Sequence, residues 1–318
     1  MAVVHSVIGT KTGLVYPSLD IIRSLQAEYG ERLMVVVDAC QLRCKLSMMK
    51  EYIDLGAFVL ITGSKFFCGP PFSGAVLCPN HLAQELENNF SPDSTRVVPV
   101  GLQSYLSPYE IPKEMPLLRA FLTIPHNQTT PREPWMNPGL VLRWSCALDT
   151  ISALSALDAE EVSRFTQEWV KGVQALVSDC GPYLKCLEEK GEDGGSNSAV
   201  MPGDICSIVS FVAMMPDSDN SDSDTLRCLH FDDMKRLWVQ MTEGSNKAAL
   251  GQPVLLSPEV TVLRVALGAQ MVVEALTPKS PDERAAIFSR MQADDAVVVG
   301  KLKELTAQRW QGKPSSRI

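Results

Sequence analysis

Two polar residues stand at the ends of two apolar runs, with a spacing that suits a shared site. Residues 33–38 form a run that ends in Asp38, and residues 57–61 form a second run that Lys65 follows. In open parallel sheets, ligands bind at the carboxyl ends of the strands. A lysine set among glycine, serine and aromatic residues has an amine whose pKa falls on desolvation, which makes it a nucleophile. The pair therefore predicts covalent or acid–base chemistry at one edge of a sheet.

This combination of amine and carboxylate is the one that pyridoxal phosphate (PLP) requires. PLP binds to proteins through a Schiff-base lysine, and a carboxylate keeps its pyridine nitrogen protonated. The residue types alone leave two ordinary interpretations open. Asp38 would serve equally well as a turn or helix-cap residue, and a single lysine such as Lys65 is usually a surface charge.

The elements that would position these residues alternate between strands and helices. The predicted strands of this part are residues 3–8, 33–38, 57–61 and 74–78. Pro17 and Ser18 begin a helix, and another helical stretch ends near Leu55. Residues 33–38 are apolar without interruption, which is typical of a strand covered on both faces. This βαβ order predicts an α/β fold with a mainly parallel sheet.

The remainder of the chain is predicted to be loop, long helix and a second group of strands. Residues 91–138 are rich in proline and are expected to be largely a loop that covers a site. Apolar residues recur at helical spacing from 148 to 176, and a polar linker is expected at 191–203. Strands are predicted at 205–214, 254–256 and 260–267. Ser280 and Glu283 form a capping box that begins a last helix, with or without a break.

Composition excludes several classes of protein. The 29 Lys and Arg residues against 37 Asp and Glu residues give a net charge of −8, which disfavours nucleic acid as a partner. Apolar runs such as 58–61 are far below the roughly 20 residues that span a bilayer. The nine cysteines have no metal-ligand spacing, so no metal is expected. Free thiols and the absence of a signal peptide in this sequence favour a reducing, cytoplasmic location.

The spacing around Asp38 and Lys65 resembles that of a known family. Asp38-x-x-Gln41, followed by Thr62-x-x-Lys65 with Gly-Pro after it, is similar to the class V aminotransferases, the fold-type I PLP enzymes that include the cysteine desulfurases. The resemblance implies that Lys65 forms the Schiff base and that Asp38 pairs with the pyridine nitrogen. It further implies that Gln41 contacts the phenolic oxygen of the ring and that Thr62 contacts the phosphate.

The resemblance continues towards the carboxyl end of the chain. Leu263-Arg264-Val265 and the residues to Gly268 are similar to the family's strand whose arginine binds a substrate carboxylate. Arg264 is accordingly expected to bind substrate, with a structural ion pair as the alternative. Ser64 stands where the family often has histidine, and it is expected to contact the phosphate.

Two departures from the family pattern bear on the reaction. Leu250 occupies the place of the nucleophilic cysteine of the desulfurases, so transamination is favoured over a lyase reaction. A role for Cys206 or Cys228 in place of that cysteine remains an alternative. Only 37 residues precede Asp38, whereas the family builds much of its cofactor site upstream of this strand. The sequence is therefore expected to lack the N-terminal part of the family.

The expected organisation is two domains with one active site. Residues 1–157 are predicted to be the later part of the large PLP-binding domain, and residues 158–318 a small α+β domain. The predicted activity is PLP-dependent transamination of an amino acid or amino donor through Lys65, in a homodimer. A PLP-dependent lyase or decarboxylase, or a non-catalytic truncated homologue, are the alternatives.

Overall fold

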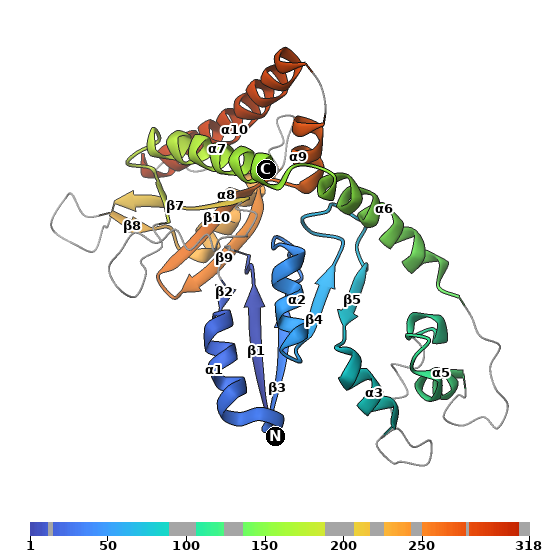
Figure 1. Ribbon diagram of the computed structural model, residues 1–318. Coiled ribbons are helices and arrows are strands. Elements are labelled where there is room, and N and C mark those ends of the chain that lie inside the picture. Colours follow the sequence, from blue (N-terminus) through green and yellow to red (C-terminus); the bar gives the residue numbers. More distant parts are fainter. Residues whose placement is uncertain are drawn as a thin grey trace.

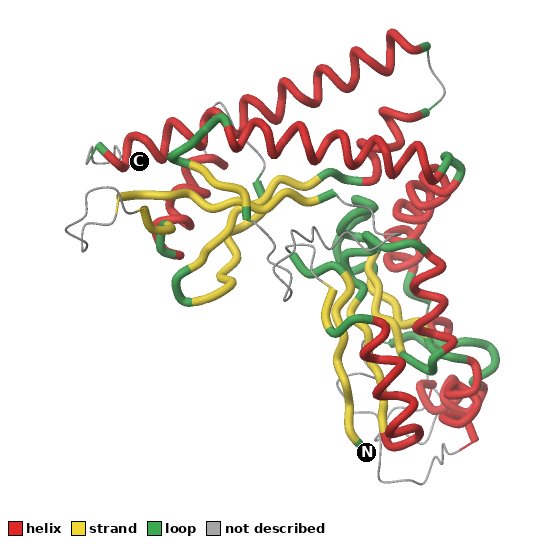
Figure 2. Tube along the Cα trace, turned by 60° about the vertical axis from the view of Figure 1, so that its left-hand side comes forward, coloured by secondary structure: helices red, strands yellow, loops and turns green. Residues whose placement is uncertain are grey.

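The described part of the chain forms two five-stranded sheets with helices packed against them (Figure 1). The computed structural model describes residues 1–11, 15–88, 106–123, 136–187, 207–216, 226–242, 250–277 and 280–311. One sheet is built from the first third of the chain and the other from the second half. Figure 2 shows the strands of the two sheets as separate groups, with long helices lying along the second sheet.

The first sheet carries Asp38 and the Lys65 turn. Its strands are β1 (Ala2–Ile8), β2 (Val15–Tyr16), β3 (Leu33–Asp38), β4 (Phe58–Thr62) and β5 (Gly74–Leu77), in the order β2-β1-β3-β4-β5. The pairs β1–β3 and β3–β4 are parallel, as predicted, and the edge strands β2 and β5 are antiparallel to their neighbours. Helices α1 (Leu19–Tyr29) and α2 (Leu46–Asp54) make the crossovers between the parallel strands. The side chain of Ser18 caps α1, as the sequence predicts.

The two faces of the first sheet differ in burial. Leu33, Val35 and Val37 of β3 are buried on one face, whereas Met34 and Val36 on the other face are only half-buried. Both faces of this strand are thus covered, one of them more fully than the other. The apolar run alone did not distinguish the two faces, because alternate residues of a strand point to opposite sides.

The proline-rich region contains more helix than its composition suggests. After α3 (Asn80–Asn88), the described part holds the short helix η2 (Pro108–Glu110) and helix α5 (Pro116–Thr123). Pro116 begins α5, a position where its missing N–H costs nothing. The carboxylate of Glu87 accepts from the N–H groups of Leu117 and Leu118, the latter at 3.2 Å. The predicted loop is thus wrong for 116–123, and residues 89–105 and 124–135 lie outside the described residues.

Two long helices lead into the second sheet. The predicted long helical region is α6 (Pro138–Ser155) followed by α7 (Ala159–Ser178), and the chain bends by 101° between them. Asp158 caps α7 through a hydrogen bond from the N–H of Glu161 at 2.8 Å. Among the described residues, no single helix is long and apolar enough to cross a membrane. The domain boundary predicted after residue 157 remains a prediction.

The second sheet carries Arg264. Its strands are β6 (Leu184–Cys186), β7 (Ile208–Pro216), β8 (Leu226–Cys228), β9 (Gly251–Ser257) and β10 (Val260–Ala266). All the described pairs in it are antiparallel, in the order β6-β7-β10-β9, and β8 pairs with β7. The strands predicted at 205–214, 254–256 and 260–267 correspond to β7, β9 and β10. The linker predicted at 191–203 lies outside the described residues.

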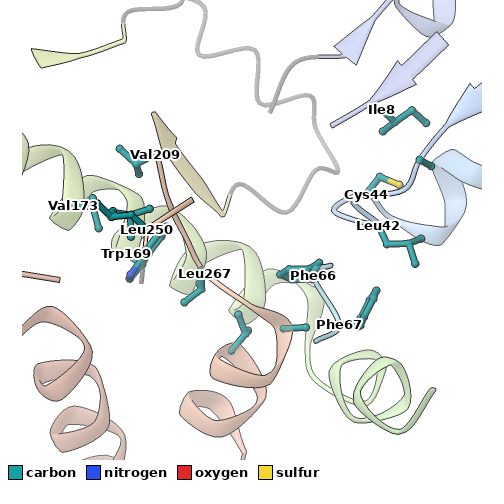
Figure 3. Packing of buried hydrophobic residues seen from close by; sticks show 14 of the residues in the cluster. Ile8, Leu42, Cys44, Phe66, Phe67, Trp169, Val173, Val209, Leu250 and Leu267 are labelled. Carbon is teal, nitrogen blue, oxygen red and sulfur yellow. The ribbon is translucent and has the colours of Figure 1, made fainter. Parts of the chain in front are cut away.

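Helices α7, α8 (Phe231–Thr242) and α10 (Pro281–Trp310) pack on the second sheet, and α9 (Ala269–Leu276) follows β10. The capping box of Ser280 and Glu283 is confirmed, because each side chain bonds the backbone of the other residue. The predicted last helix is continuous, since residues 281–310 form one helix without the break that the sequence left open. Buried residues from both sheets belong to one continuous core (Figure 3).

Candidate functional site

Asp38 ends β3 at the carboxyl edge of the first sheet. It is paired with Leu60 of β4 on one side and with Val7 of β1 on the other. Its Oδ1 atom accepts a hydrogen bond from the backbone N–H of Cys40 at 2.9 Å, and Ala39 N–H donates to the carbonyl of Leu60 at 2.9 Å. Asp38 therefore acts as a turn residue, which is one of the two interpretations that the sequence left open. The turn hydrogen bond uses Oδ1 of the carboxylate, and a ligand would bind to Oδ2.

Lys65 lies in a turn that follows β4 and has its own internal hydrogen bonds. The N–H of Gly69 donates to the carbonyl of Gly63 at 2.9 Å, and Cys68 N–H donates to the carbonyl of Lys65 at 3.0 Å. The side chain of Lys65 is exposed, whereas the rings of Phe66 and Phe67 are buried edge to face with centroids 5.1 Å apart. The two rings anchor the turn and leave the amine accessible.

The hydroxyl groups of Thr62 and Ser64 lie together at the start of this turn. Their oxygens are 2.9 Å apart, and the N–H of Ser64 donates to Thr62 Oγ1 at 3.3 Å. A pair of hydroxyls beside a backbone N–H is suited to an anion such as a phosphate. Both residues were predicted to contact the phosphate, and the structure places them side by side.

Cys40 is a neighbour of Asp38 that the sequence reasoning missed. The pKa of its thiol is raised to about 11, by burial first and then by the hydrogen bond and the negative charge of Asp38, while the positive charge of Lys65 lowers it. Asp38 ends β3 opposite Leu60 of β4, and the Lys65 turn follows β4, so the two predicted residues stand at the ends of neighbouring strands. Their contact with one shared cofactor remains a prediction.

Gln41 lies on the other side of Asp38, towards the end of β1. Gly9 directly follows β1 and has φ +69°. A Cβ built on Gly9 would lie 3.7 Å from Cβ of Gln41. Gln41 is half-buried. It stands at the same edge of the sheet as Asp38, and its predicted contact with the cofactor ring remains a prediction.

Helix α6 is seated directly on the Lys65 turn. A Cβ built on Gly63 would lie only 2.4 Å from Cβ of Ala147, and one built on Gly69 would lie 2.9 Å from the same atom. The indole N–H of Trp144 donates to the carbonyl of Gly74 at 3.3 Å. The two glycines thus allow the helix and the turn to approach more closely than any larger residue would allow.

Arg264 lies on β10 in the second sheet, opposite Ser210 of β7 and Gly251 of β9. Its side chain lies over Gly251, where an added Cβ would come within 2.6 Å of its Cγ and Nε atoms. Nη1 makes one long hydrogen bond of 3.4 Å, to the carbonyl of Gln252. Burial lowers the pKa of the guanidinium, and no carboxylate within the described ranges pairs with it.

The alternative of a structural ion pair for Arg264 therefore has no support among the described residues. A half-buried cation with one weak partner suits an anionic ligand. No described hydrogen bond or ion pair joins Arg264 to Lys65 or Asp38. The structure thus places Asp38, Thr62, Ser64 and Lys65 at the ends of the neighbouring strands β3 and β4, and Arg264 on the other sheet.

The described residues hold no group of three His, Cys, Asp or Glu side chains arranged for a metal ion. The donors near Lys65 are instead an amine, a carboxylate and two hydroxyls. This set fits PLP by its chemistry, because an aldehyde, a pyridine nitrogen and a phosphate each find a complementary group.

The comparisons with known proteins support the fold. No protein-family model matches the chain, and no curated protein matches it in sequence. Among solved structures, the fold is similar to that of alanine–glyoxylate aminotransferase from Nostoc sp., with a TM-score of 0.52 and 13% identity. The match covers 96% of this chain and 61% of that one, so the chain spans about three-fifths of the length of that enzyme. At this identity the likeness establishes an aminotransferase-like fold alone.

Proposed function

We propose that this chain is a PLP-dependent enzyme of the class V aminotransferase type that acts on an amino acid or an amino donor. The observation that supports the proposal is the placement of Asp38 and the Lys65 turn at the ends of the neighbouring parallel strands β3 and β4. Bound PLP would supply an electron sink that stabilises negative charge at the substrate α-carbon. The similarity of the fold to that of an aminotransferase also supports the proposal, by analogy of fold.

The residues of the first sheet would bind and orient this cofactor. Lys65 would hold it covalently through its exposed amine, and the free oxygen of Asp38 would hold a proton on the pyridine nitrogen. Gln41 would donate to the phenolic oxygen, and Thr62 and Ser64 would bind the phosphate. Once its amine is released, Lys65 would take a proton from the substrate α-carbon and return one, as a general base and acid.

Arg264 would bind the substrate carboxylate. Its planar guanidinium presents a fork of donors that matches a carboxylate in two parallel hydrogen bonds. The guanidinium would gain the charged partner that the described residues do not provide. The substrate class that fits is an amino acid, whose carboxylate meets Arg264 while its amino group meets the Lys65 site. We further propose that the working form is a homodimer.

Transamination is favoured over the desulfurase type of lyase by the position of Leu250. This residue is buried at 8% exposure, and its carbonyl accepts from the indole N–H of Trp238 at 3.0 Å. The position belongs to the core, where a reactive thiol would have no access. The alternative nucleophile Cys228 is half-buried, and burial raises its pKa, which disfavours the thiolate. Cys206 lies outside the described residues.

The test is a single-turnover reaction with a panel of amino acids. The protein with added PLP is mixed with each amino acid, and the 2-oxo acid and pyridoxamine phosphate are measured together. Transamination predicts the two products in equal amounts, and their loss in Lys65→Ala but not in Lys50→Ala, an exposed lysine on α2 that pairs with Asp54. Ammonia or sulfide release without pyridoxamine phosphate would establish the lyase alternative. Bound PLP with no product from any amino acid would contradict the proposal and favour a non-catalytic homologue.

A further inference from the structure

Arg43 joins the two sheets at a point beside the Lys65 turn. It lies in the segment after β3, and its Nη1 atom donates to the carbonyl of Leu267 at 2.9 Å and to the carbonyl of Ser207 at 3.3 Å. Nη1 also donates to the hydroxyl of Ser207. Leu267 directly follows β10 and Ser207 directly precedes β7, and they are 224 and 164 residues away from Arg43 in sequence. The guanidinium lies over the ring of Phe66, 4.9 Å from its centroid.

These contacts form a closed circuit with the backbone around Lys65. The carbonyl of Phe66, the residue after Lys65, accepts from the N–H of Ala269 at 2.8 Å. Ala269 begins α9, two residues after Leu267, whose carbonyl binds Arg43 and whose N–H donates to Ser207 at 2.8 Å. The contacts therefore link Arg43 to Phe66 and Phe66 to Ala269. Leu267, two residues before Ala269, is bonded back to Arg43. Figure 3 shows Phe66 and Leu267 in this region, with Leu42 on the side of the first sheet.

Two strained backbone positions flank the circuit. Leu42, directly before Arg43, has φ 51°, and Cys68, two residues after Phe66, has φ 56°. Side-chain-bearing residues rarely adopt this left-handed region and persist in it only where the surroundings hold them. Leu42 is 4% exposed, and Sγ of Cys68 would lie 3.0 Å from a Cβ built on Gly268.

We infer that Arg43 is a positioning residue that sets the Lys65 turn against the start of α9. The inference rests on the proposed function, since it concerns the lysine of the same site. The guanidinium of Arg43 lies over the ring of Phe66 and the N–H of Ala269 donates to its carbonyl, so the backbone beside the amine contacts both the segment after β3 and the start of α9. A lysine at position 43 would keep the charge but lose the planar fork and the stacking.

The test begins with hydrogen exchange in the protein without PLP. Arg43→Met keeps an unbranched apolar stem but removes the donors. We expect the amides of Ala269 and Cys68 to exchange about tenfold faster in this variant, while the amides of β3 keep their rates. Arg119→Met is the matched control, because Arg119 also lies over a ring, that of Tyr109 at 5.9 Å, and donates to a carbonyl, that of Pro108 at 3.0 Å. The control should leave the turn unchanged.

The second readout is the affinity for PLP, measured by the visible absorbance that depends on Lys65. We expect Arg43→Met to weaken binding about tenfold, Arg43→Lys to recover part of this loss, and Arg119→Met to have no effect. Unchanged exchange at Ala269 in Arg43→Met would overturn the inference. Equal acceleration of the β3 amides would also overturn it, because Arg43 would then act on global stability alone. If wild-type protein binds no PLP, the proposed function fails, and the exchange experiment still decides whether Arg43 holds the turn.

Discussion

The contact between α6 and the Lys65 turn is close enough to be tested by adding one methyl group. Gly63 is buried and its backbone is not left-handed, so alanine is allowed there by conformation. The added Cβ would nevertheless lie 2.4 Å from Cβ of Ala147. Non-bonded carbons prefer a separation of about 3.5–4.0 Å, so the helix and the turn would have to move apart by more than 1 Å.

The size of the effect follows from the packing. Overpacking of this kind costs about 1–3 kcal/mol, which is the loss expected for Gly63→Ala. Ala147→Gly removes a fully buried methyl group from the middle of α6, which costs about 1 kcal/mol in helix propensity and about 0.8 kcal/mol in burial. In the double variant the methyl group is transferred from one side of the contact to the other. Its stability should therefore be close to that of Ala147→Gly alone.

The assay is urea unfolding of the four proteins of this double-mutant cycle, followed by tryptophan fluorescence. The double variant should be more stable than the sum of the single losses predicts, by about 1–3 kcal/mol. Additivity within about 0.5 kcal/mol would refute the reasoning, because it would mean that Gly63 and Ala147 are not in contact. The indole of Trp144, which donates to the carbonyl of Gly74, gives a probe at the contact itself.

Three further predictions concern single side chains. The thiol of Cys40, with its pKa of about 11, should react with iodoacetamide about 100-fold more slowly at pH 8 than an ordinary thiol. The variant Asp38→Asn should accelerate this reaction, because it removes a charge that disfavours the thiolate. An unchanged rate in Asp38→Asn would show that the carboxylate does not lie beside this thiol. Burial raises the pKa of Asp295 above its ordinary value of 3.8, although the indole N–H of Trp169 donates to its carboxylate at 2.8 Å. The ionised carboxylate is therefore disfavoured in the fold, and the folded state loses stability as the pH rises above 3.8 and through the raised pKa. Asp295→Asn should therefore raise Tm at pH 7, and the gain should vanish below pH 3.8; a lower Tm at pH 7 would show that the charge is stabilising. Arg264→Met should raise KM for an amino acid at least about tenfold without lowering Tm, and an unchanged KM would remove this residue from the site.

The elements that carry the site were predictable because their signals are local. The apolar runs before Asp38 and Lys65 predict two strands whose ends meet, and parallel pairing of β3 with β4 brings those ends together. The capping box at Ser280 is likewise contained within four residues. Helix α5 was not predicted, because a proline at its first position is a helix start in one context and a loop signal in another.

The contacts that hold the site were not predictable, because they join distant parts of the chain. Arg43 is bonded to Leu267, and its position between ordinary loop residues gives no sign of this. The close approach of Gly63 to Ala147 depends on how α6 crosses the turn. Cys40 was one cysteine among nine, and only the fold shows that its thiol is half-buried beside Asp38. Patterns within a segment predict an element, whereas packing between segments has no local pattern.

The central claim is that Lys65 binds PLP covalently at the meeting point of β3 and β4. The most direct measurement is reduction with borohydride after addition of PLP, followed by peptide mass spectrometry across all lysines. One pyridoxyl group on Lys65 is predicted, at a stoichiometry near one per chain and absent in Lys65→Ala. An adduct spread over exposed lysines such as Lys45 and Lys50, with none at Lys65, would contradict the account.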